Sequence, residues 1–200
     1  MAETAPAAKV AYDQRLARVL VRPLARTPVT PNMLTFLNLV VALAAAWLFA
    51  QGEPRLTHWG GALFMLAMWM DHWDGELARL TRRTSRFGHF FDHAVALTTY
   101  VAAFVGIGIG LGPAALGGWA VALGAAAGIA IAAIFGVRLW IELTRGGAAV
   151  KQTIRGGFEI EDTMYVLGPI AWLGLLEPFV LLAGIGAPVF LAYTVWRALR

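Results

Sequence analysis

The chain is dominated by long apolar runs that alternate with short basic loops. Six runs cover residues 33–50, 57–80, 89–110, 114–143, 162–176 and 178–197, and the last two are short and separated only near Glu177 and Pro178. A helix needs about 20 predominantly apolar residues to cross a bilayer. Inside the hydrocarbon, every backbone polar group must also be satisfied within the protein. The pattern therefore predicts an all-α integral membrane protein with six transmembrane helices.

Composition supports a membrane protein and argues against a nucleic-acid partner. Hydrophobic residues make up 59% of the 200 residues and charged residues 14%, whereas about a quarter of an average soluble domain is charged. The mean hydropathy is +0.67 and the pI is near 10. The basic residues, however, lie at the ends of the apolar runs and form no separate basic domain. Because the chain has no cysteine, disulfides and thiolate metal ligands are excluded.

The basic residues also predict the orientation of the chain. All of the 16 Lys and Arg residues except Arg55 and Arg138 lie before the first run, or at or beyond the C-terminal ends of the second, fourth and last runs. By the positive-inside rule, both termini and the loops after the second and fourth runs face the cytoplasm, which requires an even number of spans. The expected location is the inner membrane of a bacterium.

Residues 1–32 form a separate cytoplasmic segment before the first run. Apolar Leu16, Val19 and Leu20 alternate there with Arg15 and Arg18, which favours an amphipathic helix lying in the membrane interface. A basic tail that only fixes the topology is the alternative. The rest of the chain, residues 33–200, is expected to be one transmembrane domain.

Three aspartates border the second and third apolar runs. Asp71 and Asp74 are spaced i, i+3 and so share a helix face, and Asp92 starts the next run. Acidic residues at membrane depth are costly and usually mark a functional site. Carboxylate oxygens without thiols suit Mg²⁺, Mn²⁺ or Ca²⁺. The alternative is that these acids only pair with nearby arginines, and spacing alone does not decide between the two interpretations.

The segment closely resembles the signature of the CDP-alcohol phosphotransferases, D-x2-D-G-x2-A-R-x8-G-x3-D-x3-D, which spans two transmembrane helices. The chain matches this signature at Asp71, Asp74, Gly75, Ala78, Arg79, Gly88 and Asp92. It departs at the last position, where Ala96 replaces the expected aspartate. In the family, that aspartate is the base for the attacking alcohol and helps to hold a metal, and a methyl group can do neither.

The resemblance implies roles for individual residues. Asp71, Asp74 and Asp92 are expected to hold one or two divalent cations, Mg²⁺ or Mn²⁺. The expected nucleotide contacts are Asn32, Gly75, Ala78, Arg79, Ser85 and Gly88. All of these except Ser85 also have a purely structural interpretation, namely helix packing for the small residues, anchoring for Arg79, and helix capping around Thr30 and Asn32.

Two basic clusters are candidates for binding a phosphorylated acceptor or lipid headgroups. They comprise Arg82, Arg83, Arg86, Lys151 and Arg155, although topology alone also explains them. His89 is a candidate substitute base, because a histidine titrates near neutrality. The sequence assigns no role to Glu159, Glu161 and Asp162.

The function implied by the resemblance is an enzyme of phospholipid biosynthesis, of the EC 2.7.8 type. It would transfer a phosphatidyl-type group from a CDP-linked donor, CDP-diacylglycerol, to an alcohol acceptor and release CMP. Because of Ala96, this chain is expected to be impaired or inactive. The alternative is a catalytically silent member that binds CDP-lipid or regulates a partner. Small residues in the third and fourth runs also allow a homodimer.

Overall fold

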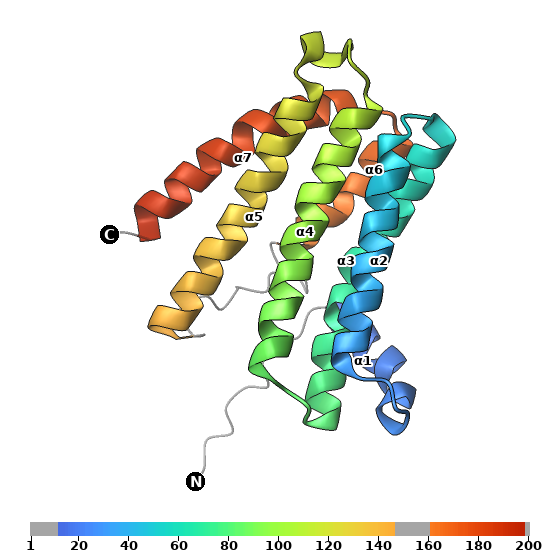
Figure 1. Cartoon of the computed structure of the whole chain (residues 1–200), viewed down its shortest axis with the longest axis vertical. Coiled ribbons are helices and arrows are strands. Elements are labelled where there is room, and N and C mark those ends of the chain that lie inside the picture. The colour runs from blue at the N-terminus through green and yellow to red at the C-terminus, as the bar shows by residue number, and fades with distance from the viewer. Residues whose placement is uncertain (1–11, 147–160, 199–200) are drawn as a thin grey trace.

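The computed structural model describes residues 12–146 and 161–198, and these residues form helices joined by short turns (Figure 1). No strand occurs among these residues. The α-helices are α1 (Tyr12–Val21), α2 (Pro31–Ala50), α3 (Pro54–Thr81), α4 (Arg86–Gly110), α5 (Ala120–Arg145), α6 (Leu167–Trp172) and α7 (Leu176–Ala198). Short 3₁₀ helices are η1 (Pro23–Arg26), η2 (Ala115–Gly118) and η4 (Glu161–Val166). The all-α prediction is confirmed.

Within the described residues, α2, α4, α5 and α7 are long and apolar enough to cross a membrane. The 28-residue helix α3 covers the expected second span, but it carries the charged residues of the candidate site in its last third. The count of six spans therefore stays a prediction.

The expected fifth span, 162–176, is not one continuous helix. It is divided between η4 and the six-residue α6. Gly174 ends α6 with a φ of +70°, while the Leu175 N–H donates to Ile170 O at 3.0 Å and the Gly174 N–H donates to Ala171 O at 3.2 Å. This pair of bonds is the Schellman arrangement that stops a helix at a glycine. The expected start of the fourth span at 114 is also too early, because Leu116 and Gly117 have positive φ and α5 begins at Ala120.

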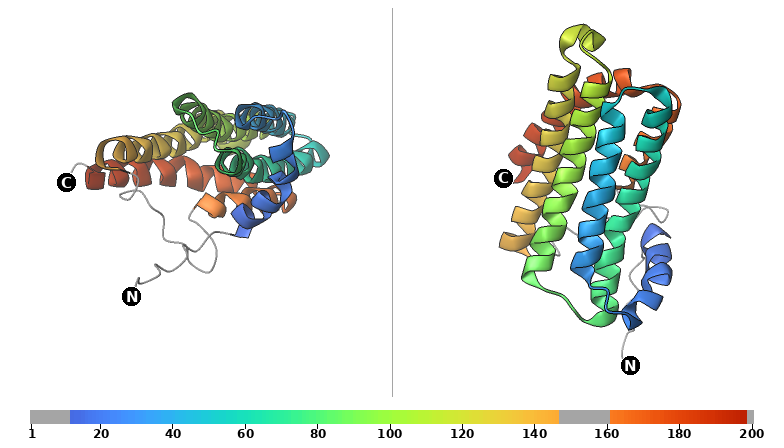
Figure 2. Two further views of the ribbon diagram at one scale, coloured as in Figure 1. Left: turned by 90° about the horizontal axis from the view of Figure 1, so that it is seen from below. Right: turned by 45° about the vertical axis from the view of Figure 1, so that its right-hand side comes forward.

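Helix α1 lies against the C-terminal part of α3 (Figure 2). Its residues Ala17 and Val21 are fully buried, whereas Leu16 and Val19 are each 62% exposed. The helix therefore has one apolar face against the protein and further apolar residues that the protein does not cover. Its position in a membrane interface stays a prediction.

The long helices form a bundle in which the neighbours follow the order α3–α2–α4–α5–α7 (Figures 1 and 2). Close approach depends on missing side chains. A Cβ on Gly106 of α4 would lie 2.3 Å from the backbone oxygen of Ala46 on α2, and one on Gly124 of α5 would lie 2.4 Å from that of Phe104 on α4. Small residues at helix contacts are typical of membrane bundles. These glycines serve packing within one chain, and a homodimer stays a prediction.

Candidate functional site

A cavity of about 260 Å³ opens at the end of the bundle where α3 passes into α4. Helix α2 contributes Pro31, Asn32 and Thr35 to its wall, and the remaining residues come from α3, the 82–85 turn and the start of α4. The lining includes all six predicted nucleotide contacts, Asn32, Gly75, Ala78, Arg79, Ser85 and Gly88, together with Asp74 and Asp92. The fold thus brings residues of three helices together around one open space.

The turns that form this cavity are fixed by helix caps. Thr30 caps α2, because its side chain accepts a hydrogen bond from the Met33 N–H at 3.3 Å. Ser85 caps α4 in the same way, accepting from the Gly88 N–H at 2.9 Å. Side-chain caps of this kind satisfy backbone donors that have no partner inside the helix. The capping interpretation of Thr30 is therefore confirmed, whereas the cap at Ser85 was not predicted, and Ser85 also lines the cavity.

Asp74 is the most buried of the three aspartates, with 5% of its surface exposed. Its carboxylate accepts a hydrogen bond from the Thr35 hydroxyl of α2 and one from the Gly75 N–H at 2.6 Å. A buried carboxylate is tolerated only when its oxygens are satisfied. Thr35 therefore fixes the orientation of Asp74 from the neighbouring helix.

Asp71 does not reach this cavity. It lines a second one, of about 150 Å³, together with Asp92 and Ala96. Within the described part of the chain, Asp92 is the one residue that lines both cavities. Asp71 and Ala96 also line a narrow space of about 10 Å³ beside Asn38. A side chain longer than alanine at position 96 would project into the space next to Asp71.

Gly88 faces Asn32 across the first cavity. A Cβ at position 88 would lie 3.0 Å from the Asn32 side-chain oxygen and 3.0 Å from the Ser85 hydroxyl oxygen. Such contacts are tighter than side chains ordinarily make, so a larger residue there would displace the cavity wall. The missing side chain at 88 keeps this wall open.

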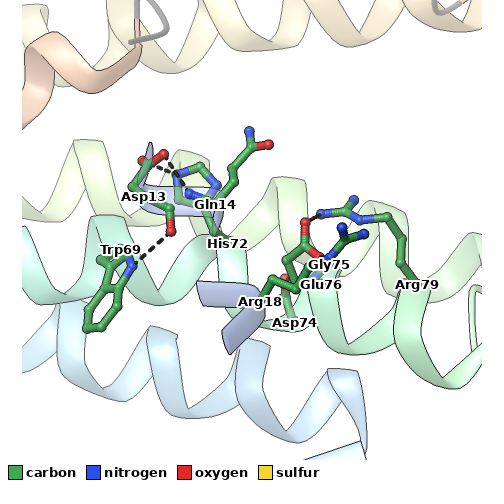
Figure 3. Close-up of polar contacts among 9 residues, drawn as sticks. All are labelled: Asp13, Gln14, Arg18, Trp69, His72, Asp74, Gly75, Glu76 and Arg79. Carbon is green, nitrogen blue, oxygen red and sulfur yellow. Dashed lines mark hydrogen bonds and ion pairs between the residues drawn. The ribbon is translucent and has the colours of Figure 1, made fainter. Parts of the chain in front are cut away.

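Arg79 is held by a buried acid that sequence reasoning did not identify. The Glu76 side chain is 4% exposed, and its carboxylate accepts from Arg79 Nη2 at 2.7 Å and from Arg18 Nε of α1 at 3.0 Å (Figure 3). Charge-assisted bonds of this kind are among the stronger ones in proteins. Glu76 therefore links the N-terminal helix to an arginine of the cavity.

A second set of contacts holds α1 to α3 one turn away. Asp13 Oδ2 lies 2.8 Å from His72 Nε2, and the indole N–H of Trp69 donates to the backbone oxygen of Asp13 at 3.2 Å (Figure 3). The Tyr165 hydroxyl also donates to Asp13 Oδ2, at 3.4 Å. Asp13 thus ties three parts of the chain together beside the site.

A family model, described as CDP-alcohol phosphatidyltransferase, matches residues 28–196. The chain belongs to this family. The match covers most of the chain and includes both cavities and every long helix.

Two curated relatives of the family are similar over part of this chain. A bifunctional IPC transferase and DIPP synthase of Rubrobacter xylanophilus is 38% identical over 86 residues, which cover 43% of this chain and 19% of that protein. An archaetidylinositol phosphate synthase of Pyrococcus horikoshii is 30% identical over 89 residues, which cover 44% of this chain and 46% of that protein. The chain therefore spans less than half the length of these curated relatives.

Solved structures show the same fold. A phosphatidylinositol phosphate synthase of Mycobacterium tuberculosis, crystallised with CDP-DAG bound, superposes with a TM-score of 0.60. It is 21% identical in sequence, and the alignment covers 91% of this chain and 94% of that one. The apo form of the same enzyme gives a TM-score of 0.57.

The predicted acceptor residues of this CDP-alcohol phosphatidyltransferase are spread over several places. Arg83 lines the first cavity, and Arg86 lines a shallower one nearby. Arg82 ends α3 in a left-handed conformation, with φ +56°. Lys151, Arg155 and Glu159 lie outside the described residues, and of Glu161 and Asp162 the structure gives only their place at the start of η4. Arg138 lines the second cavity with Asp71 and Asp92.

The structure distinguishes between the two histidines of α4. His89 lines the first cavity, whereas His93 lines the second cavity together with Ala96. In the geometry of the fold, His93 is thus nearer than His89 to the place of the missing aspartate. The substitute-base role for His89 stays an untested prediction with less geometric support.

Two polar residues of α2 were missed at the sequence level. Thr35 and Asn38 are 2% and 3% exposed, and with Asn32 they are spaced i, i+3, i+6 in an otherwise apolar helix. Residues at this spacing share a face. A polar stripe on an apolar transmembrane helix was therefore the available signal that α2 forms one wall of the site.

Proposed function

We propose that this chain binds a CDP-linked lipid, CDP-diacylglycerol, at the first cavity and has the site architecture for transferring its phosphatidyl group to an alcohol. The observation that carries the proposal is that all six predicted nucleotide contacts line one open space together with Asp74 and Asp92. A structural relative was solved with CDP-DAG bound, which supports the choice of donor.

Each group of residues is proposed to have its own role in binding the donor. Arg79 presents a charged, planar donor group suited to a phosphate, and Glu76 restricts where that group can point. The gap over Gly88 leaves room for the nucleotide beside Asn32. Asp71, Asp74 and Asp92 would hold a divalent cation, Mg²⁺ or Mn²⁺, in one or two sites, and such an ion neutralises phosphate charge as CMP leaves.

Ala96 is proposed to limit turnover. The acceptor hydroxyl must lose its proton as it attacks the phosphorus atom bonded to the lipid alcohol, and the bond to the CMP oxygen breaks. Loss of a positioned base typically costs about 10²–10⁴-fold in rate. Since residue 96 lies beside Asp71 in the second cavity, that cavity is the proposed place of the acceptor.

The proposed acceptor is an inositol phosphate. The Pyrococcus and Mycobacterium proteins are named archaetidylinositol phosphate synthase and phosphatidylinositol phosphate synthase, and both names refer to a lipid product that carries inositol phosphate. A phosphorylated acceptor needs cationic partners, and Arg83, Arg86 and Arg138 lie around the two cavities and the shallower one nearby. Lys151 and Arg155 are further candidates from the sequence.

A silent CDP-lipid-binding member is the second candidate, and Ala96 is the observation that favours it. The test uses purified chain in micelles with radiolabelled CDP-diacylglycerol, Mg²⁺ and inositol phosphate, and follows both bound lipid and released CMP. Enzymatic function predicts slow CMP release that Ala96→Asp accelerates at least about 100-fold. Binding without release in both proteins would establish the silent member, and absence of binding would refute the proposal altogether.

The chain is further proposed to cross a bacterial inner membrane six times, with the cavities and both termini on the cytoplasmic side. The absence of native cysteine makes this directly testable. Thr84→Cys and Gln51→Cys each place a single cysteine in a turn, and the two turns lie at opposite ends of α3. In intact cells, a membrane-impermeant maleimide should label the cysteine at position 51 and spare the cysteine at position 84. The reverse result would invert the topology.

A further inference from the structure

Three potential metal ligands converge between α4 and α5, apart from the aspartates of the signature. They are His89 and His93 on α4 and Glu142 in the last turn of α5. One ligand atom from each lies within 4.8 Å of the other two, and all three side chains are partly buried. Helices α4 and α5 are neighbours in the bundle (Figure 1), and this cluster lies between the first half of α4 and the last turn of α5.

The two histidines are arranged as metal ligands often are. They are spaced i, i+4, and their ring centroids lie 4.5 Å apart. His93 Nδ1 lies 3.0 Å from the backbone oxygen of His89. With the proton on Nδ1, this contact is a hydrogen bond, and Nε2 carries the lone pair with which a histidine binds a metal. Metal-binding histidines usually donate their other ring N–H to a carbonyl or carboxylate in this way.

The charge around the cluster favours a cation. His93 and Glu142 line the second cavity together with Asp71, Asp92 and Arg138. Among the residues that the structure describes, the cavity wall therefore carries three carboxylates and one guanidinium group. A divalent ion placed here would meet an excess of negative charge.

We propose that His89, His93 and Glu142 bind a divalent transition-metal ion of the Zn²⁺ type and thereby tie α4 to α5. Two imidazoles and one carboxylate form an established zinc ligand set that leaves one position open. Imidazole nitrogen suits Zn²⁺, whereas sites built from carboxylate oxygens suit Mg²⁺. Bond lengths of about 2.0–2.2 Å bring ligand atoms within about 4 Å of one another, so small side-chain rotations complete the site.

The open coordination position has access to solvent. His89 and Glu142 also line the shallower, more open cavity beside Thr84 and Arg86. This opening supplies both an entry path and room for a water molecule as fourth ligand, which a metal site requires. The proposal concerns metal binding by these three side chains and holds whether or not the chain transfers a phosphatidyl group.

The test measures Zn²⁺ and Co²⁺ binding to chain purified without a polyhistidine tag and stripped with chelator. We expect one tightly bound Zn²⁺ per chain and, with Co²⁺, the visible absorption of a low-coordinate site. His89→Ala, His93→Ala and Glu142→Gln should each weaken binding at least about tenfold, since even the loss of outer-shell partners costs 10- to 100-fold. Each variant is compared at equal recovery of monodisperse protein.

One control and one added ligand make the result specific. His58→Ala removes a histidine of α3 that lines a different cavity, beside Phe49 and Gly110, so this variant should retain tight Zn²⁺ binding. His93→Cys should create a thiolate-to-Co²⁺ charge-transfer band, which is assignable because the chain has no other cysteine. Unchanged Zn²⁺ affinity in the cluster variants, equal loss in His58→Ala, or no charge-transfer band would overturn the proposal.

Discussion

Replacing Glu76 by glutamine should measurably destabilise the protein, because one buried carboxylate serves two arginines. The Glu76 side chain is 4% exposed, whereas Arg18 and Arg79 are 49% and 55% exposed. Glutamine keeps the size of the side chain and one acceptor oxygen. Its amide NH₂, however, directs donors toward a guanidinium group that also only donates.

The expected magnitude follows from these contacts. A hydrogen bond to a charged group contributes about 1.5–3 kcal/mol to the free energy of unfolding. The glutamine of the variant would retain a weaker bond to one arginine and lose the other, while water can solvate the half-exposed guanidinium that is released. We therefore expect a loss of about 2 kcal/mol. For a chain of this length, 1 kcal/mol shifts the Tm by about 2–4 °C, which gives a decrease of about 4–8 °C.

Thermal unfolding in detergent micelles, followed by tryptophan fluorescence, measures this decrease. A double-mutant cycle with Arg18→Ala isolates the contact between α1 and α3, and contacting residues typically couple by about 0.5–3 kcal/mol. Arg22→Ala is the matched control, since Arg22 is an exposed arginine just after α1, and should change the Tm little. CDP affinity should fall in Glu76→Gln as well, because Arg79 loses its anchor. A Tm within about 1 °C of the parent, well below the expected decrease, together with strictly additive effects of the Arg18 and Glu76 changes, would refute the reasoning.

Three further outcomes are expected. CDP at about 100 times its Kd should stabilise the protein by about 2.7 kcal/mol with Mg²⁺ present, and the same Tm rise in excess chelator would contradict a metal-dependent site. Asp74→Asn or Asp92→Asn should abolish this Tm rise. Arg55→Ala, in the first turn of α3 at the other end of that helix, should preserve it. Full CDP affinity in the Asp variants would show that these acids are structural. Gly88→Ala should lower CDP affinity several-fold with little change in Tm, because its Cβ would press on the Asn32 oxygen, and unaltered affinity measured by titration would show that the nucleotide does not use this gap.

The parts of the site that were predictable lie close together in the sequence. Gly75, Ala78 and Arg79 share one helix with Asp74, and Gly88 follows after a short turn. The resemblance of this short segment to the family signature predicts that they line a common space, and the first cavity contains all of them. The long apolar helices were predictable for a similar reason, because hydropathy is a property of a continuous segment.

The missed parts depend on contacts between distant segments. Arg18 and Glu76 are 58 residues apart, and Thr35 and Asp74 are 39 apart. No periodicity in one segment reveals which residue of another segment it will contact. Helix breaks were also missed where backbone conformation outweighed hydropathy, as at Leu116 and Gly174, which both adopt positive φ.

The separation of the two cavities gives Ala96 a more specific meaning than simple loss of function. Of the described residues, Asp92 alone lines both spaces, whereas Ala96 and Asp71 belong to the second one only. The wall that carries Arg79, Gly88 and Asn32 therefore does not depend on residue 96. In the proposed reaction, a carboxylate missing from position 96 would remove a proton acceptor and a cation ligand on the proposed acceptor side, while the surface proposed for the nucleotide would be unaffected. We therefore expect donor binding and turnover to be separable in this chain, since a single substitution would impair one cavity without reshaping the other.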